Sequence, residues 1–334
     1  MTESCFRFLK FPSVVLTEII CSSNTDSLVS LSLCSQKAHH LVKSEIRRFS
    51  EFKLLMVQDA SSIAKIETQN RSFNALLAFP IEEESQANSL QSVKICGRSV
   101  VLGVTNGNLC TFWEDLVLGF KEIMEYVSDL FNVQIHQITF RRTHLWMIDW
   151  VQSRQNGVPY ALIPESERLT AEEYQFVMDT CTAEILELRA IPPHDFKTLE
   201  AFIPRQRFLI YDGNWVRLEH LLRMNAAELV VNHFNLIDLC DVLNIVLKQW
   251  LAGKMRYLKT MRILSMLPIS RDAVFRELES KMTIVQHERQ YPVTPNNRLI
   301  VPANTVDIKR KDGRVASVQV FQLSFNLLVW PDNS

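Results

Sequence analysis

The sequence predicts an α/β protein in which a short helical segment precedes a larger domain of alternating helices and strands. Apolar residues recur at helical spacing over the first fifty residues, and helix-like and strand-like segments alternate from about 165 to 265. Near the end, Asp312-Gly313 separates two strand-like runs. The 334 residues, 47% hydrophobic and 22% charged, suffice for about two globular domains. We therefore expect a helical domain over 1–50 and an α/β domain over 51–334.

The first fifty residues predict three short helices. Pro12 suits the start of the first helix, where its missing N–H costs nothing. Asp26 and Ser35 are candidate caps for the second and third helices. The apolar residues at helical spacing are Val15, Leu16, Ile19, Ile20, Leu28, Leu31, Leu33, Ala38, Leu41 and Val42. So short a bundle cannot bury all of them, and the following domain or a partner protein must cover the remainder.

Short strands and one strong helix are expected between residues 51 and 164. Asn106-Gly107, between the strands VVLGVT and LCTF, is a hairpin signal. Thr111 followed by Glu114 matches a capping box, which predicts a helix with an apolar stripe from Trp113 to Leu130. The strand VQIHQITF follows, and VQSRQNGVPY is expected to be a loop.

Helices and strands alternate from about 165 to 265. Thr170 and Glu173 form a second capping box at the start of the helix AEEYQFVMDTC. The strands EILELRA, RFLIYDG, AELVVNH and KTMRIL follow, with the helix WVRLEHLLRM and a long helix from Leu236 to Leu251 between them. Asn235 is the expected cap of the long helix, and Gly253 its expected end. Strands that recur about every twenty to thirty residues favour a curved helix–strand stack resembling leucine-rich repeats, although no strict repeat consensus is present.

The last seventy residues predict a different arrangement. The segment RDAVFRELESKM reads as a charged helix, and YPVTPNN as a loop. VDIKRKDGRVASVQVF reads as a β-hairpin that turns at Asp312-Gly313, and FNLLVW as a final strand.

The charge balance argues against several classes of protein. The 36 basic and 37 acidic residues give a net charge of −1, whereas proteins that bind nucleic acids or anionic membranes usually carry a basic excess. No uncharged apolar run of about 18 residues predicts a membrane span, and Glu3, Lys10 and Glu18 interrupt the N-terminal sequence, so we expect no signal peptide. The seven cysteines are scattered without a C-x-x-C pair, which favours free thiols in an intracellular protein over a zinc site.

No catalytic motif was found. The sequence lacks G-x-S-x-G, H-E-x-x-H, a P-loop and G-x-G-x-x-G, and its eight glycines are few for a phosphate-binding cofactor fold. His39-His40 directs two rings to different sides of a helix, which favours a solvated pair over a metal site. We therefore expect a protein that is not an enzyme and that binds no cofactor or metal.

The N-terminal segment resembles an F-box. The residues that carry the resemblance are Phe11-Pro12, Val15-Leu16, Ile19-Ile20, Leu28, Leu31-Ser32-Leu33-Cys34-Ser35, Lys37 and Leu41-Val42. The resemblance implies that these helices bind a Skp-type adaptor and, through it, the cullin of a ubiquitin ligase. The residues implied for adaptor binding are Pro12, Leu16, Ile19, Ile20, Leu28 and Leu31 on an exposed apolar face, with Leu33 expected to be partly internal.

The remainder resembles nematode F-box proteins with a type 2 F-box-associated domain. The matching segments are YVSDLF at 126–131, WVRLEHLLRMNAAELVV, LIDLCDVLNIVLKQWLAGK with its Asn244 and Trp250, and IKRKDGRVASV. With the F-box they span most of residues 5 to 325. Two positions depart from the family, which often has a large apolar residue in place of Ser23 and an acid in place of Ser27.

The expected target-binding face follows from strand alternation. In EILELRA, Leu186 and Leu188 should point inward, whereas Glu187 and Arg189 should point outward. The same alternation directs other polar side chains to the exposed face, where arginine and aromatic residues are favoured contacts. These are Arg207, Tyr211, Glu228, Asn232, Thr260 and Arg262, and the candidate target-binding residues are Glu187, Arg189, Arg207, Tyr211, Asn232 and Arg262.

Three functional interpretations follow. The first is a non-catalytic substrate adaptor of a Skp–cullin–F-box ubiquitin ligase, which holds an unknown target protein near the ligase. The second is a stand-alone protein-binding module whose F-box no longer docks the adaptor, an alternative raised by Ser23 and Ser27. The third is an enzyme without a recognisable motif, which would need a deep polar pocket with converging titratable side chains. The sequence leaves open the target and the choice between nucleus and cytoplasm.

Overall fold

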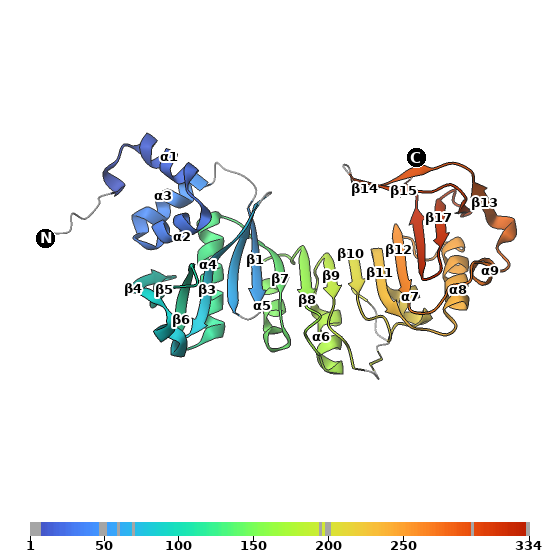
Figure 1. The fold of residues 1–334 in the computed structure, drawn as a ribbon, viewed down its shortest axis with the longest axis horizontal. Coiled ribbons are helices and arrows are strands. Elements are labelled where there is room, and N and C mark those ends of the chain that lie inside the picture. The colour runs from blue at the N-terminus through green and yellow to red at the C-terminus, as the bar shows by residue number, and fades with distance from the viewer. Residues whose placement is uncertain are drawn as a thin grey trace. The chain divides into compact units, whose positions relative to one another are not determined.

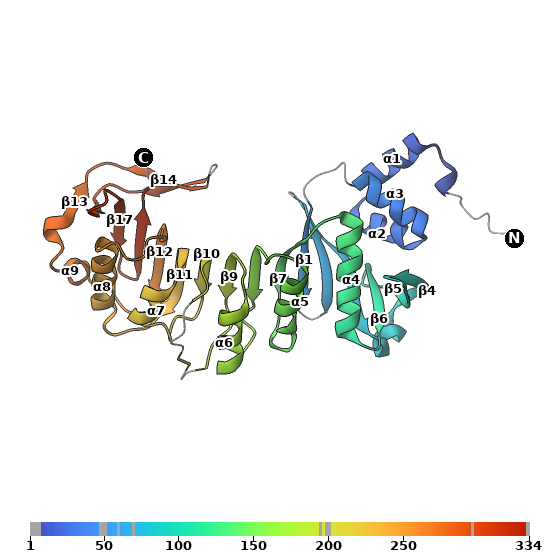
Figure 2. The same cartoon turned by 180° about the vertical axis from the view of Figure 1, so that it is seen from behind.

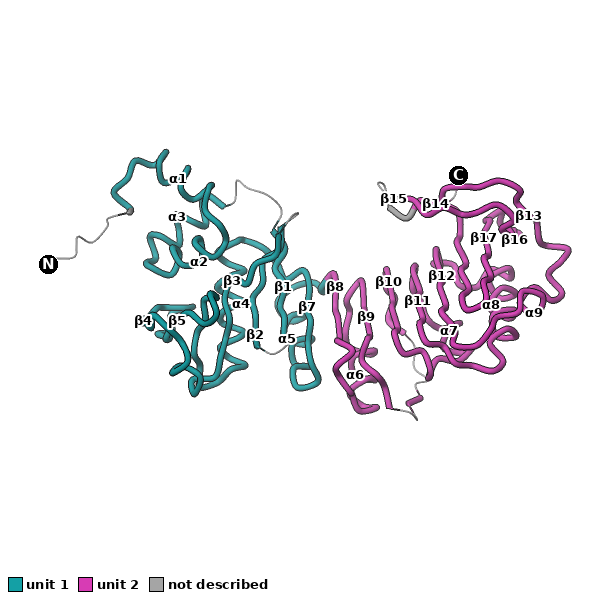
Figure 3. The backbone as a smooth tube through the Cα atoms, viewed as in Figure 1, with its two compact units in different colours: residues 1–158 teal, residues 159–334 magenta. Residues whose placement is uncertain are grey.

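The computed structural model describes residues 8–46, 52–58, 61–68, 71–193, 196–197, 202–294 and 297–331. The chain divides into two compact units, residues 1–158 (unit 1) and residues 159–334 (unit 2), shown in Figure 3. The N-terminal helices belong to unit 1, and the domain boundary expected near residue 50 stays a prediction. The mixed α/β class with an N-terminal helical segment is confirmed.

Three helices form the N-terminal segment, as predicted. They are α1 (Ser13–Ser22), α2 (Thr25–Leu33) and α3 (Gln36–Ile46), preceded by the 3-10 helix η1 (Phe8–Lys10). The Ser35 hydroxyl caps α3 by accepting from the Ala38 N–H at 3.2 Å. The predicted cap of α2 is wrong, because Asn24 rather than Asp26 accepts from the Ser27 N–H, at 2.8 Å.

The rest of unit 1 is a sheet with helices packed against it. Its strands, in spatial order, are β7 (Ile135–Thr139), β1 (Lys53–Gln58), β2 (Ser62–Glu67), β3 (Ser72–Pro80), β6 (Asn108–Trp113), β5 (Arg98–Thr105) and β4 (Asn88–Ile95). Its helical elements are η2 (Ile81–Gln86), α4 (Leu116–Phe131), η3 (Arg142–His144) and α5 (Trp146–Arg154). Helix α4 packs against β2, β3 and β6 and also contacts α3 (Figure 1). It therefore connects the N-terminal helices to the sheet.

Two expectations for unit 1 are corrected. Thr111 does not cap a helix: it lies in β6, its hydroxyl donates to the Leu77 carbonyl at 2.9 Å, and Asp115 caps α4 by accepting from the Leu118 N–H at 3.0 Å. The segment expected to be a loop before Pro159 begins inside α5, because its first residues complete that helix. The Asn106-Gly107 turn is confirmed, with φ values of 50° and 78° that suit the twist of a tight hairpin.

Unit 2 contains the predicted alternation of helices and strands. Parallel strands β8 (Tyr160–Ile163), β9 (Ile185–Leu188), β10 (Arg205–Ile210), β11 (Ala226–Phe234) and β12 (Thr260–Ser265) lie side by side in chain order. Helices α6 (Ala171–Thr180), α7 (Leu218–Arg223) and α8 (Leu239–Leu251) connect them and lie on one side of the strands (Figure 2). The Thr170–Glu173 capping box is confirmed in full. Helix α8 begins at Leu239 and is therefore shorter than the helix predicted from Leu236. Asp238, not Asn235, occupies its cap position.

Antiparallel strands complete the sheet of unit 2. Beyond β12 lie β18 (Ser324–Val329), β17 (Val315–Val320), β16 (Thr305–Lys309) and β13 (Met282–Val285), in that order. Gly313, at φ 93°, turns the predicted hairpin between β16 and β17. Only five residues of the predicted charged helix form α9 (Arg271–Phe275), and η4 (Glu279–Lys281) follows. The predicted YPVTPNN loop instead contributes to a separate hairpin, β14 (Arg289–Thr294) and β15 (Asn297–Val301).

Candidate protein-binding surfaces

Apolar side chains remain exposed along the start of the N-terminal helices. Leu9, Phe11, Val14 and Val15 are all exposed, and Val14 keeps 70% of its surface accessible. These four residues are called the α1 strip. Pro12 is exposed beside them, and Ile19 is half-buried on the same helix. Adjacent exposed apolar residues of this kind mark an interaction surface more often than scattered single ones do.

The predicted adaptor-binding residues are divided between surface and core. Leu16, Ile20 and Leu28 are buried inside unit 1, with Leu16 only 7% exposed, so the expected exposure of these three residues is wrong, whereas Leu33, expected to be partly internal, is buried. Ile19 and Leu31 are half-buried, and Pro12 is exposed. The error arises because α1 packs on α3 and β3 packs on α2, and helical periodicity alone could not tell which face these contacts would cover.

Polar contacts hold the N-terminal helices on α4. The Ser32 and Tyr126 hydroxyls lie 2.7 Å apart in a buried hydrogen bond, and burial raises the pKa of Tyr126 to about 12. His39 Nε2 lies 2.9 Å from an Asp129 oxygen, and the Lys43 ammonium donates to the other oxygen of that carboxylate. Partial burial opposes ionisation of Asp129, but the bonds from Lys43 and His39 outweigh it and hold the pKa of this carboxyl below its ordinary value. The YVSDLF segment of the resemblance thus anchors the helices.

A hollow lies beside Ser23, at one of the two positions that depart from the family. It measures about 390 Å³ and has Ile20, Leu28 and Phe73 among its lining residues. The small Ser23 side chain offers no apolar group to fill this hollow. Its hydroxyl donates to the Ile19 carbonyl at 2.6 Å. Ser27 is exposed in the first turn of α2.

The predicted target-binding residues gather on the open face of the unit 2 sheet. Register aligns Arg207, Glu228 and Thr260 in one row across β10, β11 and β12. It aligns Leu209, Val230 and Arg262 in the next row on the same face. The neighbouring positions Leu186, Phe208, Leu229 and Met261 point to the opposite, helix-covered face and are buried. The predicted inward direction of Leu186 and Leu188 is therefore correct, and the polar residues between them share the other face.

Glu187 lies on the open face but is not exposed, which corrects its predicted accessibility. It is only 5% exposed, because the Tyr160 hydroxyl donates to its carboxylate and the Arg189 guanidinium pairs with it at 2.5 Å. Burial and the Glu187 carboxylate raise the pKa of Tyr160, which keeps this phenol a hydrogen-bond donor. Arg189 also lies over the Tyr211 ring, 4.9 Å from its centroid. Glu187 thus positions Arg189 and Tyr160, and these two side chains cover its carboxylate.

A groove of about 950 Å³ covers much of this face (the unit 2 groove). Strands β10, β11, β12 and β18 form its floor, and the β14–β15 hairpin and the segments 256–259 and 330–331 line its margin. Four of the six candidate target-binding residues line the groove, namely Arg207, Tyr211, Asn232 and Arg262, whereas Glu187 and Arg189 lie outside its lining. The sequence missed the margin residues Arg256, Tyr257 and Lys259, which precede a strand and have no periodic signal.

The β14–β15 hairpin is fixed to the sheet at the side of the groove. Arg289 donates to both carboxylate oxygens of Asp307, at 2.8 and 2.6 Å, and to the Ser317 hydroxyl at 2.8 Å. The Arg289 guanidinium also stacks over the Trp330 ring at 4.6 Å. Tyr291 donates to the Val329 carbonyl at 3.0 Å. A bidentate and stacked arginine gives this margin a defined position.

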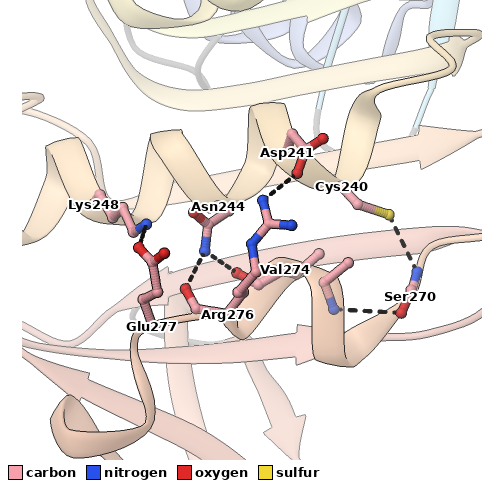
Figure 4. Close-up of polar contacts among 9 residues, drawn as sticks. Cys240, Asp241, Asn244, Lys248, Ser270, Val274, Arg276 and Glu277 are labelled. Atoms are coloured by element: carbon pink, nitrogen blue, oxygen red, sulfur yellow. Dashed lines mark hydrogen bonds and ion pairs between the residues drawn. The ribbon is translucent and has the colours of Figure 1, made fainter.

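Asn244, part of the family resemblance, joins α8 to α9 on the covered side of unit 2. Figure 4 shows its amide nitrogen donating to the Val274 and Arg276 carbonyls, each at 2.9 Å. Asn244 is buried, and the two carbonyls lie at the end of α9, where helical partners are lacking. Exposed ion pairs flank it, Lys248 with Glu277 and Arg276 with Asp241, each at 2.6 Å. Asn244 therefore stabilises the fold.

Trp250 and the Asp312-Gly313 turn also serve the fold. Trp250 is fully buried in α8, and the Arg310 guanidinium lies 5.3 Å from its ring centroid. Arg310 pairs with Asp312 at 2.6 Å and lies 3.6 Å from the place where a side chain at Gly253 would begin. Gly253, at φ 89°, ends α8 as predicted. These contacts attach the β16–β17 turn to the end of α8.

The described part of the chain contains neither a metal-binding cluster nor a membrane-spanning helix. Within those residues, no group of three histidine, cysteine or acidic side chains could hold a metal ion. No described helix is both long enough and apolar enough to cross a membrane. Six of the seven cysteines are free thiols, and Cys5 lies outside the described residues.

Comparison with known proteins identifies two domains. A family model described as an F-box domain matches residues 8–50, which include all three N-terminal helices, and a model described as F-box associated matches residues 187–263. The second match begins within β9, ends within β12 and contains all six candidate target-binding residues. No curated protein and no solved structure matches the chain. The expected nematode origin stays a prediction, whereas the resemblance to an F-box and to an F-box-associated domain is confirmed over these two segments.

Proposed function

We propose that this chain is the substrate-recognition subunit of a Skp–cullin–F-box ubiquitin ligase and performs no chemistry itself. The F-box would bind a Skp-type adaptor, and the F-box-associated domain would bind the target protein. Holding both on one chain raises the effective concentration of the target near the ligase. An intracellular location, in nucleus or cytoplasm, follows from this role.

The α1 strip carries the proposal. Val14 and Val15 of α1 are exposed while Leu16 and Ile20 of the same helix are buried, so α1 is covered on one side and exposed on the other. A few apolar anchors of this kind supply most of the affinity of a protein interface. We accordingly assign adaptor binding to the α1 strip with Pro12, Ile19 and Leu31, and a supporting role to the buried Leu16, Ile20, Leu28 and Leu33.

The test is co-purification of the full chain with a Skp-type adaptor. Val14→Asp places a charge on the α1 strip and should weaken binding about tenfold or more, because one apolar anchor contributes roughly 1.5–3 kcal/mol. Ile237→Asp is the matched control, since Ile237 is a β-branched residue 95% exposed in unit 2. Leu16→Asp is unsuitable because a charge at this buried position would unfold the helices.

The intact chain and Ile237→Asp should co-purify with the adaptor, and Val14→Asp should not, while circular dichroism shows all three folded. Equal retention of Val14→Asp would contradict the assigned surface. No binding by the intact chain would contradict the ligase role.

A stand-alone protein-binding module is the second candidate, and the hollow at Ser23 favours it. An apolar side chain common in the family is replaced there by a serine, which leaves space beside Ile20 and Leu28. Ser23→Leu should fill this space. If the intact chain does not bind the adaptor and Ser23→Leu does, the chain is a stand-alone module whose F-box lost adaptor binding at this position.

A further inference from the structure

We infer that the unit 2 groove binds an acidic peptide segment of the target protein. This inference rests on the proposed function and names the chemistry of the target. The groove lies wholly within unit 2, and its lining residues between 206 and 262 belong to the F-box-associated match.

The charge of the groove differs from that of the whole chain. Five basic residues and one acidic residue line it, whereas the full sequence has a net charge of −1. The single acid, Glu228, is already paired with Arg207 at 3.4 Å. The lining therefore keeps an excess of positive charge that its own carboxylates do not neutralise, and a surface of one sign favours a partner segment of the other.

Three of the cations are exposed and have no acidic partner among the described residues: Arg256, Lys259 and Arg262. Arg262 projects from the middle of the floor, where register places the uncharged Val230 on one side and Asn326 on the other. Arg256 and Lys259 lie at the margin beside Tyr257, which is 71% exposed. A guanidinium in the floor and two cations at the margin can contact successive carboxylates of one segment.

The size and the apolar lining favour a peptide over a small anion. The groove volume of about 950 Å³ lies near the top of the range of roughly 300–1,000 Å³ that small-molecule pockets span. A groove of this size has room for several residues of a peptide. Leu209, Val230 and Leu264 line the floor between the polar residues, and Trp330 lies at the margin. The bound segment should therefore combine acidic residues with at least one apolar or aromatic side chain.

The test is selection of peptides from a random displayed library by the immobilised full chain. The selected pool should be enriched in Asp and Glu over the unselected library. Fluorescence polarisation then measures one selected peptide against Lys259→Glu, with Lys281→Glu as the control because Lys281 is exposed on η4 and outside the groove. Arg262→Glu and the milder Arg262→Gln address the floor.

Lys259→Glu and Arg262→Glu should each lower the affinity for the peptide about tenfold or more. Arg262→Gln should lower this affinity less, and Lys281→Glu should leave it unchanged. Added salt should weaken binding as well. A pool without acidic enrichment, or equal affinity of the groove and control variants, would overturn the inference. Loss of adaptor binding with acidic peptides still selected would contradict only the ligase role, so the two failures are distinguishable.

Discussion

The two faces of the unit 2 sheet differ although the same strands form them. On β11, Leu229 is buried beneath the helices, whereas the next residue, Val230, lines the groove. On β12, Met261 and Arg262 show the same division. One face carries stability and the other is free to carry binding chemistry, so each can change without the other.

Three residues of the family resemblance serve the covered side of the sheet. Asn244 and Trp250 lie in α8, and Arg310 reaches Trp250 from the β16–β17 turn. All three stabilise packing, and none lines the unit 2 groove. These three residues therefore hold the domain together, whereas the residues that line the groove are free for binding.

The largest expected effect is on packing. Leu229→Ala should lower the free energy of unfolding by about 2–5 kcal/mol, because it removes a buried side chain and leaves a cavity. Val230→Ala, at the next residue, should lower the free energy of unfolding by less than about 1.5 kcal/mol, because the Val230 side chain is only half-buried in the groove. Urea denaturation of both variants measures the difference, and equal losses would show that the two faces are not distinct.

Asn244→Ala should have the next largest effect. It would leave the Val274 and Arg276 carbonyls without their donor, at a cost of about 1–3 kcal/mol for each group that stays buried. Asn326→Ala is the control, because the Asn326 amide donates only to Gln319 on the open face, at 3.1 Å. Thermal denaturation should show a clearly lower midpoint for Asn244→Ala than for Asn326→Ala. Similar midpoints would remove Asn244 from the fold-stabilising set.

A smaller effect is expected where the F-box helices meet α4. Asp129→Asn should cost less than about 1 kcal/mol, because the Asp129 side chain is 56% exposed and solvent screens its ion pairs. Since the pKa of Asp129 is lowered in the folded state, its contribution is complete above the ordinary pKa of the unfolded chain and is lost as pH falls through the lower folded value.

The cost of Asp129→Asn should accordingly be constant between about pH 7 and pH 5 and shrink in more acidic solution. Asp149→Asn, at an exposed position on α5, is the control for the removal of one surface carboxylate. A cost that grew on acidification would have the wrong sign for this account.

Local patterns predicted most of the fold. Periodic apolar residues located α1 to α3, and strand alternation assigned Leu186 and Arg262 to opposite faces correctly. Turns with a steric requirement were also predictable, as at Gly253 and Gly313, because few residues adopt a positive φ. The Thr111 prediction failed because the capping box is a short pattern, and tertiary pairing placed Thr111 in β6.

The candidate site was predictable in part. Alternation found Arg207, Tyr211, Asn232 and Arg262, since every second residue of a strand faces the same side. It could not show that Tyr160 and Arg189 bury Glu187, because the Tyr160 contact joins separate strands and the pairing of Glu187 with its near neighbour Arg189 depends on how both side chains turn. It also could not separate Val14 from Leu16, because both fit a helical stripe and only the packing of unit 1 covers one of them.

The most direct test of the central claim is binding of adaptor and acidic peptide by the same preparation of the full chain. The account predicts that Val14→Asp loses the Skp-type adaptor and keeps the selected peptide, whereas Arg262→Glu loses the peptide and keeps the adaptor. A variant that lost both while remaining folded, or an intact chain that bound only one at a time, would contradict two independent binding surfaces.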